Sequence, residues 1–176
     1  SHHLPCIFGG VGSSAQHAAW QAAFVAESAA LSGLDHIQGL LDLVKAFETV
    51  PHWVLVRAAR AKGYPIIIIR LSLGAYRLKR SIGIEGVFSR LIVATRGITA
   101  GSGFATAELK VLLQDTMEEL HTRWAMVITI KLFVDDLTLS TCGWPQVAVH
   151  RMVQVLNFVI HRLEVDLLME VSGSKS

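Results

Sequence analysis

The sequence predicts an α+β fold in which an antiparallel sheet is backed by helices. Long segments with helical periodicity, notably residues 106–124 and 146–163, alternate with short apolar segments of β type. Of the 176 residues, 52% are apolar and 17% are charged, which allows a buried core and excludes a disordered chain. Two apolar segments also flank a pair of acidic residues, a pattern typical of an antiparallel hairpin.

The composition predicts neither secretion nor a membrane partner. The longest apolar segments, residues 64–69 and 125–128, are far shorter than the ~20 residues of a membrane-spanning helix. No basic and then apolar leader opens the chain, and Cys6 and Cys142 are too few for a disulfide framework. We therefore expect an intracellular protein, nuclear or cytoplasmic, and a piece of a longer one because the chain begins with Ser.

An alanine-rich helix ending near Leu31 is the first predicted element. Ser13 and Gln16 have the spacing of a capping box, and Gly33 is suited to the turn that ends a helix. We assign residues 1–35 to this N-terminal helical segment.

A buried strand is predicted next, over residues 36–44, with the carboxylate of Asp42 in its interior. A charge in a buried strand is costly unless it has a partner or a ligand. We therefore expect the Asp42 carboxylate to be paired or to bind a ligand. A second helix follows over residues 53–62, between Pro51 and Gly63.

The middle of the chain leaves one alternative open. Residues 65–76 contain four consecutive isoleucines, which favour a strand, whereas Pro65 and the length of the segment favour a helix. Residues 81–94 contain short alternating runs split by Gly83 and Gly86, which predicts a hairpin.

The last third of the chain is predicted to form a helix, a hairpin and a second helix. Asp135 and Asp136 separate two apolar segments and are therefore placed at the tip of the hairpin. The elements in order are a helix over 106–124, strands over 125–134 and 137–141, and a helix over 146–163.

Basic residues are concentrated between positions 57 and 96, where nine of them occur with a single acid, Glu85. Such a block can neutralise the phosphates of a nucleic acid, although a solvated helix face is the alternative. The candidate nucleic-acid-binding residues are Arg57, Arg60, Lys62, Arg77, Lys79 and Arg80.

Three acidic residues are candidates for one metal site. Asp42 precedes Asp135 and Asp136 by about ninety residues, a separation that lets strand and hairpin meet at one edge of a sheet. Carboxylates there could hold two divalent cations, which can activate a hydroxyl group and stabilise a leaving pyrophosphate. The alternatives are an Asp-rich turn and, for Asp42, a buried acid paired with an arginine.

Three segments in register resemble the reverse transcriptase palm of non-LTR retroelements and group II introns. Residues 41–47 (LDLVKAF) resemble its motif A, residues 96–103 its glycine-rich motif B, and residues 133–136 (FVDD) its motif C. His52 resembles the histidine that usually follows motif A, and Lys175 resembles the lysine of motif D.

This resemblance implies a polymerase palm over residues 36–176, partial fingers in residues 1–35, and no thumb. The implied function is RNA-directed DNA polymerase, which adds dNTPs to a primer on an RNA or DNA template by two-metal-ion nucleotidyl transfer. Mg²⁺, or Mn²⁺, is the implied cofactor.

The resemblance also implies a role for each matching residue. Asp42, Asp135 and Asp136 would be the catalytic metal ligands. Phe47 would be the steric gate that rejects a ribose 2′-hydroxyl, and Lys175 would protonate or order the pyrophosphate. The residues implied to contact the substrate are Phe47, Gly97, Gly101, Ser102 and Lys175.

Two positions depart from the family pattern. Ala100 stands where motif B commonly has Gln, and Glu48 stands where motif A often has Asp. The Ala100 departure motivates an alternative: a catalytically decayed reverse transcriptase relic that only binds nucleic acid or serves as an interaction scaffold.

Overall fold

The computed structural model describes residues 7–8, 15–99 and 101–173. It mixes helices and strands, which confirms the predicted α+β class. The chain divides into two compact units, here called unit 1 (Ser1–Val44 and Leu113–Ser176) and unit 2 (Lys45–Leu112). Ser13 of the predicted capping box lies outside the described residues.

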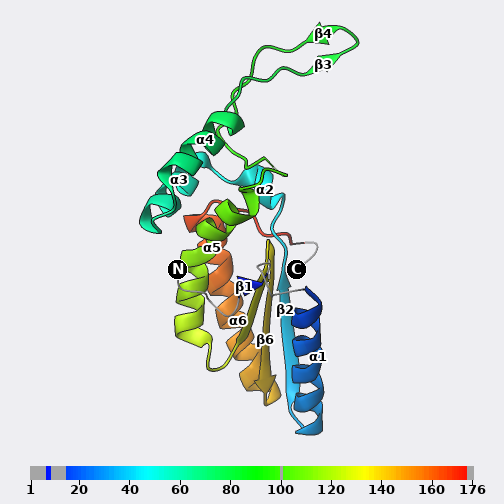
Figure 1. The fold of residues 1–176 in the computed structure, drawn as a ribbon. Helices are drawn as coiled ribbons and strands as arrows, with labels where there is room; N and C mark the ends of the chain where they lie inside the picture. The colour runs from blue at the N-terminus through cyan, green and yellow to red at the C-terminus, as the bar shows by residue number, and fades with distance from the viewer. Residues whose placement is uncertain (1–6, 9–14, 100, 174–176) are drawn as a thin grey trace. The chain divides into compact units, whose positions relative to one another are not determined.

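Unit 1 contains a four-stranded sheet with the order β1-β5-β6-β2 (Figure 1). The strands β5 and β6 form an antiparallel hairpin, and β6 also pairs antiparallel with β2. The short β1 pairs parallel with β5 at the other edge. The strands are β1 (Ile7–Phe8), β2 (Asp35–Leu41), β5 (Thr129–Phe133) and β6 (Asp136–Gly143).

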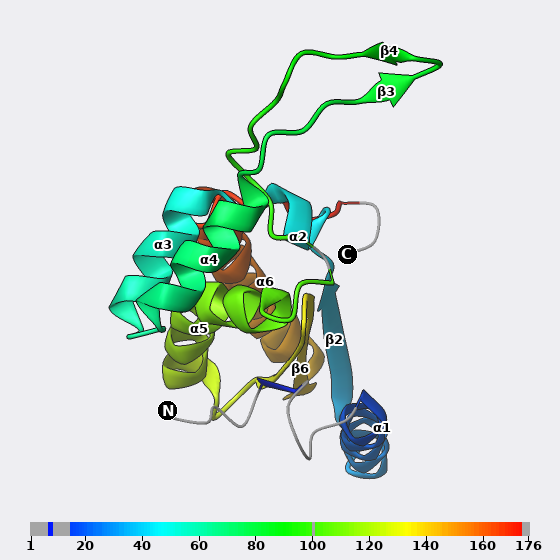
Figure 2. The same cartoon turned by 45° about the horizontal axis from the view of Figure 1, so that its top comes forward.

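Helices cover this sheet (Figure 2). Helix α6 (Pro145–His161), continued by the π-helical turn η1 (Arg162–Asp166), packs against β2 and β6. Gly39 allows close approach here, because a Cβ at this position would lie 3.2 Å from Leu156 Cδ2 on α6. Helix α1 (Ala15–Leu31) lies along β2 and also contacts β6.

Unit 2 consists of three helices, a hairpin and the first turns of a fourth helix, α5, which continues into unit 1. Helix α3 packs against α4. The elements are α2 (Ala46–Thr49), α3 (His52–Ala61), α4 (Ile66–Tyr76), β3 (Gly83–Ile84), β4 (Val87–Phe88) and α5 (Ala105–Trp124).

The ambiguous isoleucine segment is helix α4. Its buried residues, Ile69, Ser72 and Tyr76, recur at the helical spacing of three and four positions. Ile67 on the outer face is 64% exposed. The isoleucines are therefore not all buried, as they would be in a strand covered on both faces. Pro65 stands at the N-cap, where its missing N–H costs nothing.

The hairpin predicted over residues 81–94 is confirmed, with two residues in each strand. Gly86 makes the turn with a φ of +85°. The hairpin extends away from α3 and α4 (Figure 1), and the side chains of Ile84 and Phe88 are about 70% and 72% exposed.

Several predicted boundaries were wrong by a few residues. The strand predicted over 36–44 ends at Leu41, so Asp42 lies just beyond it rather than in its interior. Asp136 is the first residue of β6 and not part of the turn. Strand β5 begins only at Thr129, because residues 125–127 form the turn after α5 and residue 128 has no regular structure. Among the described residues, no helix is long and apolar enough to span a membrane.

Candidate active site

The strand register brings Asp42 and Asp136 to the same end of the sheet. Leu40 pairs with Thr138 and Leu41 with Leu137, so the next residues on the two chain segments are Asp42 and Asp136. Both residues line an open cavity of about 470 Å³. The structure therefore places two of the three predicted ligands side by side in unit 1.

The backbone around Asp42 is held by the segment after η1. The N–H of Ser172 donates to the Asp42 carbonyl at 2.8 Å, and the N–H of Val44 donates to the Glu170 carbonyl at 2.9 Å. These bonds continue the pairing of the chain beyond β2 and fix the backbone that carries the carboxylate.

Asp135 lies in the tight turn between β5 and β6. Phe133 pairs with Asp136, so Val134 and Asp135 alone form the connection. Val134 has a φ of +60°, a left-handed conformation that costs a β-branched residue about 1–3 kcal/mol. The residue next to the candidate ligand is thus strained, as residues beside functional sites often are.

Replacing Val134 by glycine should stabilise the protein by about 1 kcal/mol, because glycine adopts positive φ without the steric penalty. Thermal unfolding should then shift upward by about 3 °C. The same substitution at Val153, an exposed position on helix α6, should instead lower the melting temperature. A lower melting temperature for Val134→Gly would contradict the strain.

The carboxyl group of Asp135 is affected by burial and by the charges of its two acidic neighbours. Burial raises the pKa of Asp135 above its ordinary value, a hydrogen bond from its own backbone acts in the opposite direction, and the charges of Asp136 and Asp42 raise it further. Asp135 is therefore close enough to both neighbours for their negative charges to matter, and a bound cation would relieve this repulsion.

The chemistry of these side chains fits a hard divalent cation. Carboxylate oxygens are the ligands that Mg²⁺ and Mn²⁺ prefer. Among the residues that the structure describes, however, no three His, Cys, Asp or Glu side chains form a group that could hold a metal ion. The donor type and the shared location of the described carboxylates fit such an ion.

In unit 2, the predicted gate and the glycine-rich loop are joined by backbone hydrogen bonds. Phe47 lies in α2, and its carbonyl accepts the N–H of Ile98 at 2.7 Å. The N–H of Gly97 donates to the Val50 carbonyl at 2.8 Å. The structure thus brings Phe47 and Gly97 together.

The remaining loop residues lead into α5. Gly101 has a φ of +86°, and the Ser102 Oγ accepts the N–H of Phe104 at 3.3 Å. The Ser102 carbonyl accepts the N–H of Ala105, the first residue of α5. Ser102 thereby stabilises the start of the helix. Lys175 lies outside the described residues.

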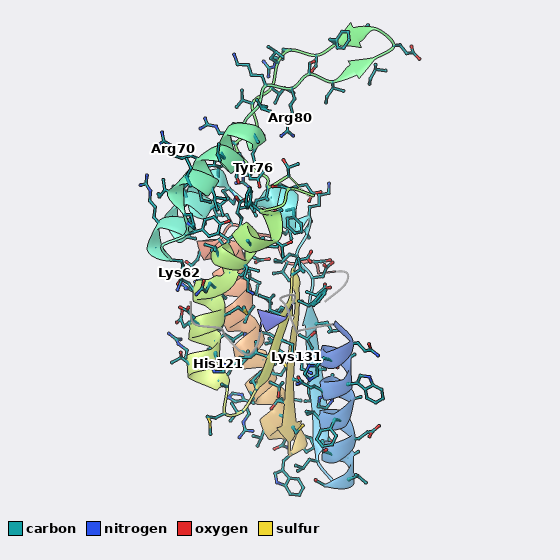
Figure 3. The ribbon with its side chains drawn as sticks, viewed as in Figure 1. Lys62, Arg70, Tyr76, Arg80, His121 and Lys131 are labelled. Atoms are coloured by element: carbon teal, nitrogen blue, oxygen red, sulfur yellow. The ribbon has the colours of Figure 1, made fainter. Side chains whose placement is uncertain are left out.

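The candidate nucleic-acid-binding residues lie on or directly after α3 and α4. Arg57 lies 5.2 Å from the ring centroid of Trp53, and Arg80 donates to the Tyr76 carbonyl at 3.1 Å. Apart from the partly buried Lys62, these side chains are exposed, as is the neighbouring Arg70 (Figure 3). The residues of this set are Arg57, Arg60, Lys62, Arg77, Lys79 and Arg80.

Sequence reasoning missed a buried polar pair in unit 2. Tyr76, in the interior of the unit (Figure 3), donates from its hydroxyl to Glu108 Oε2 at 2.8 Å, and Ser102 Oγ lies 3.4 Å away. Glu108 is fully buried. The burial of Glu108 could have been predicted from its position on the apolar face of α5, where it lies between Ala105 and Leu112 at helical spacing.

Lys131 was also missed. It is 7% exposed in β5, and burial lowers its pKa. A cavity of about 410 Å³ is lined by Lys131 together with Trp20 and Phe24 of α1. Lys131 could have been singled out from the sequence as the one charged residue in the apolar strand β5.

No known protein-family model matches the chain, and no curated protein matches it.

Proposed function

We propose that this chain is a reverse transcriptase palm that adds deoxynucleotides to a primer on an RNA template. The observation that carries the proposal is the β2–β6 register, which brings Asp42 beside Asp136 while the β5–β6 turn holds Asp135 next to them. The sequence motifs and the strand register both support a site at this end of the sheet. The α+β architecture is compatible with a palm.

The acidic cluster would act by binding and orienting. Asp42 and Asp135 would hold Mg²⁺, with Asp136 beside them. When bound, Mg²⁺ favours ionisation of the primer 3′-hydroxyl and offsets the charge of the departing pyrophosphate. The carboxylates would set where the hydroxyl and the triphosphate meet, which is the positioning that phosphoryl transfer needs.

Unit 2 would supply the contacts to the sugar and the nucleic acid. The ring of Phe47 would exclude a ribose 2′-hydroxyl, and the loop with Gly97, Gly101 and Ser102 would lie under the nascent base pair. Lys175 would assist the pyrophosphate. The exposed basic residues on α3 and after α4 would neutralise backbone phosphates of the template and primer, RNA or DNA.

Primer extension by the full-length protein tests the proposal. With a DNA primer, an RNA template, dNTPs and Mg²⁺, the primer should lengthen, and chelation of Mg²⁺ should stop the reaction. Template strands of DNA should be compared in parallel. Absence of extension on both templates, with Mg²⁺ or Mn²⁺, would overturn the assignment.

A second candidate is a relic that binds nucleic acid without catalysis. It is favoured by Ala100, which stands in place of the usual Gln. Thermal unfolding with increasing Mg²⁺ separates the two. A functional site should be stabilised by Mg²⁺ through mass action, and Asp42→Ala should remove the effect; a relic should show RNA binding without it.

A further inference from the structure

His52 is a buried side chain that the proposed chemistry does not use. It is the first residue of α3, is 8% exposed, and its Nε2 lies 2.9 Å from the Gly97 carbonyl oxygen. A carbonyl oxygen only accepts, so Nε2 carries the proton and donates. The other nitrogen, Nδ1, is buried without a hydrogen-bond partner in the described part of the chain.

The backbone around this contact forms a continuous seam within unit 2. The N–H of His52 donates to the Thr95 carbonyl at 3.2 Å, and Pro51 forms a bridge with Arg96. Further along the seam lie the bonds from Gly97 to Val50 and from Ile98 to Phe47 described above. The hydrogen bond from the His52 imidazole to the Gly97 carbonyl adds a side-chain contact to these backbone bonds.

Gly97 is the residue at which the loop closely approaches the backbone of α2. Its φ is +98°, and a Cβ there would lie 3.1 Å from the Glu48 carbonyl oxygen. Glycine is favoured here because a side chain would crowd the backbone of α2 and would be strained at this φ. The backbone position of Phe47 and that of the loop are thus fixed by the same few atoms.

We propose that His52 is a positioning residue for sugar discrimination, which holds the Gly97 peptide and through it the backbone of Phe47. This inference rests on the proposed function, in which Phe47 is the gate. The imidazole N–H of His52 is bonded to the Gly97 carbonyl. It would therefore affect the position of Phe47 through the backbone, without contacting the nucleotide. Loss of the donor loosens the seam, so the Phe47 ring samples more positions and rejects a 2′-hydroxyl less well.

The test compares His52→Leu, which removes the donor, with His52→Gln, whose side-chain amide can place an N–H near the position of Nε2. His150→Leu, at an exposed position on α6, is the matched control. Two quantities are measured: the hydrogen-exchange rates of the Gly97 and Ile98 amides, and the ratio of kcat/KM for a dNTP to that for the matching rNTP.

In His52→Leu we expect both amides to exchange about tenfold faster and the dNTP-to-rNTP ratio to fall about tenfold, as loss of one hydrogen bond implies. His52→Gln should restore most of both, and His150→Leu should change neither. Gly97→Ala, which forces the loop from α2, should lower the ratio in the same direction.

The outcomes separate this inference from the proposed function. An active wild type whose His52→Leu variant keeps its sugar ratio, or keeps slow exchange at Gly97 and Ile98, overturns the role of His52 and leaves the polymerase assignment standing. An inactive wild type overturns the polymerase assignment and the sugar-gate role with it. In that case exchange alone reports whether His52 holds the loop.

Discussion

Replacing Asp135 by asparagine should lower the rate of primer extension at least about thousandfold. Asparagine keeps the size of the side chain but removes a negatively charged oxygen, and the stabilisation of transition-state charge by a metal site amounts to several kcal/mol. The measurement is the single-nucleotide extension rate of the full-length protein at saturating Mg²⁺ and dNTP.

The same substitution should make the protein more stable at neutral pH. Since the folded state raises the pKa of Asp135, the fold binds its proton more tightly than the unfolded chain does. The resulting stability is fully present below the ordinary pKa of about 4 and is lost as the pH rises through the raised value. Asp135→Asn should therefore melt higher than the wild type at pH 7, with the difference disappearing near pH 3.

Asp35→Asn is the matched control, because Asp35 is exposed at the opposite end of β2 from Asp42. Asp35→Asn makes the same change of charge. It should leave the rate of primer extension and the melting temperature at pH 7 as they are in the wild type. Loss of activity together with a lower melting temperature would show that Asp135 acts through the fold rather than through ligand binding. Normal extension by Asp135→Asn would remove it from the site.

Tyr76→Phe should destabilise the protein by about 1–3 kcal/mol, because it leaves the buried Glu108 carboxyl without its donor. Chemical denaturation at neutral pH measures the change. Glu108→Leu in the Tyr76→Phe background should recover part of the loss, since the buried carboxyl that lost its donor is then removed as well. Additive losses in the double variant would contradict a direct coupling.

The pH dependence of this pair has a definite sign. Burial raises the pKa of the Tyr76 hydroxyl, the bond with Ser102 opposes this, and the bond to and the charge of Glu108 raise it further. The fold therefore favours the neutral phenol, and stability should decline as the pH rises above about 10, through the raised value. Tyr76→Phe should lack this alkaline decline.

Much of the fold could be predicted from the sequence because its helices carry clear periodicity. The helices predicted over 53–62 and 106–124 match α3 and α5 to within one residue. The helix α4 could not be decided from residue types, because isoleucine favours strands while its burial pattern follows the helical period. Strand ends were misplaced because they are set by pairing partners far along the chain.

The site was predictable only as a set of residues. The spacing of Asp42 and Asp136 suggested convergence, but their adjacency depends on the register between β2 and β6, which sequence spacing leaves undetermined. The contacts of His52 with Gly97 and of Tyr76 with Glu108 join residues 45 and 32 positions apart. Such pairs arise from tertiary packing and leave no local pattern.

The hairpin of β3 and β4 has a practical consequence for work with the protein. Its apolar side chains, such as Val87 and Phe88, face solvent next to unpaired strand edges. Exposed strands of this kind promote association between molecules as concentration rises. Charged substitutions at Val87 and Ile84 are thus the first choice for keeping concentrated samples monodisperse, and they leave the acidic cluster of unit 1 untouched.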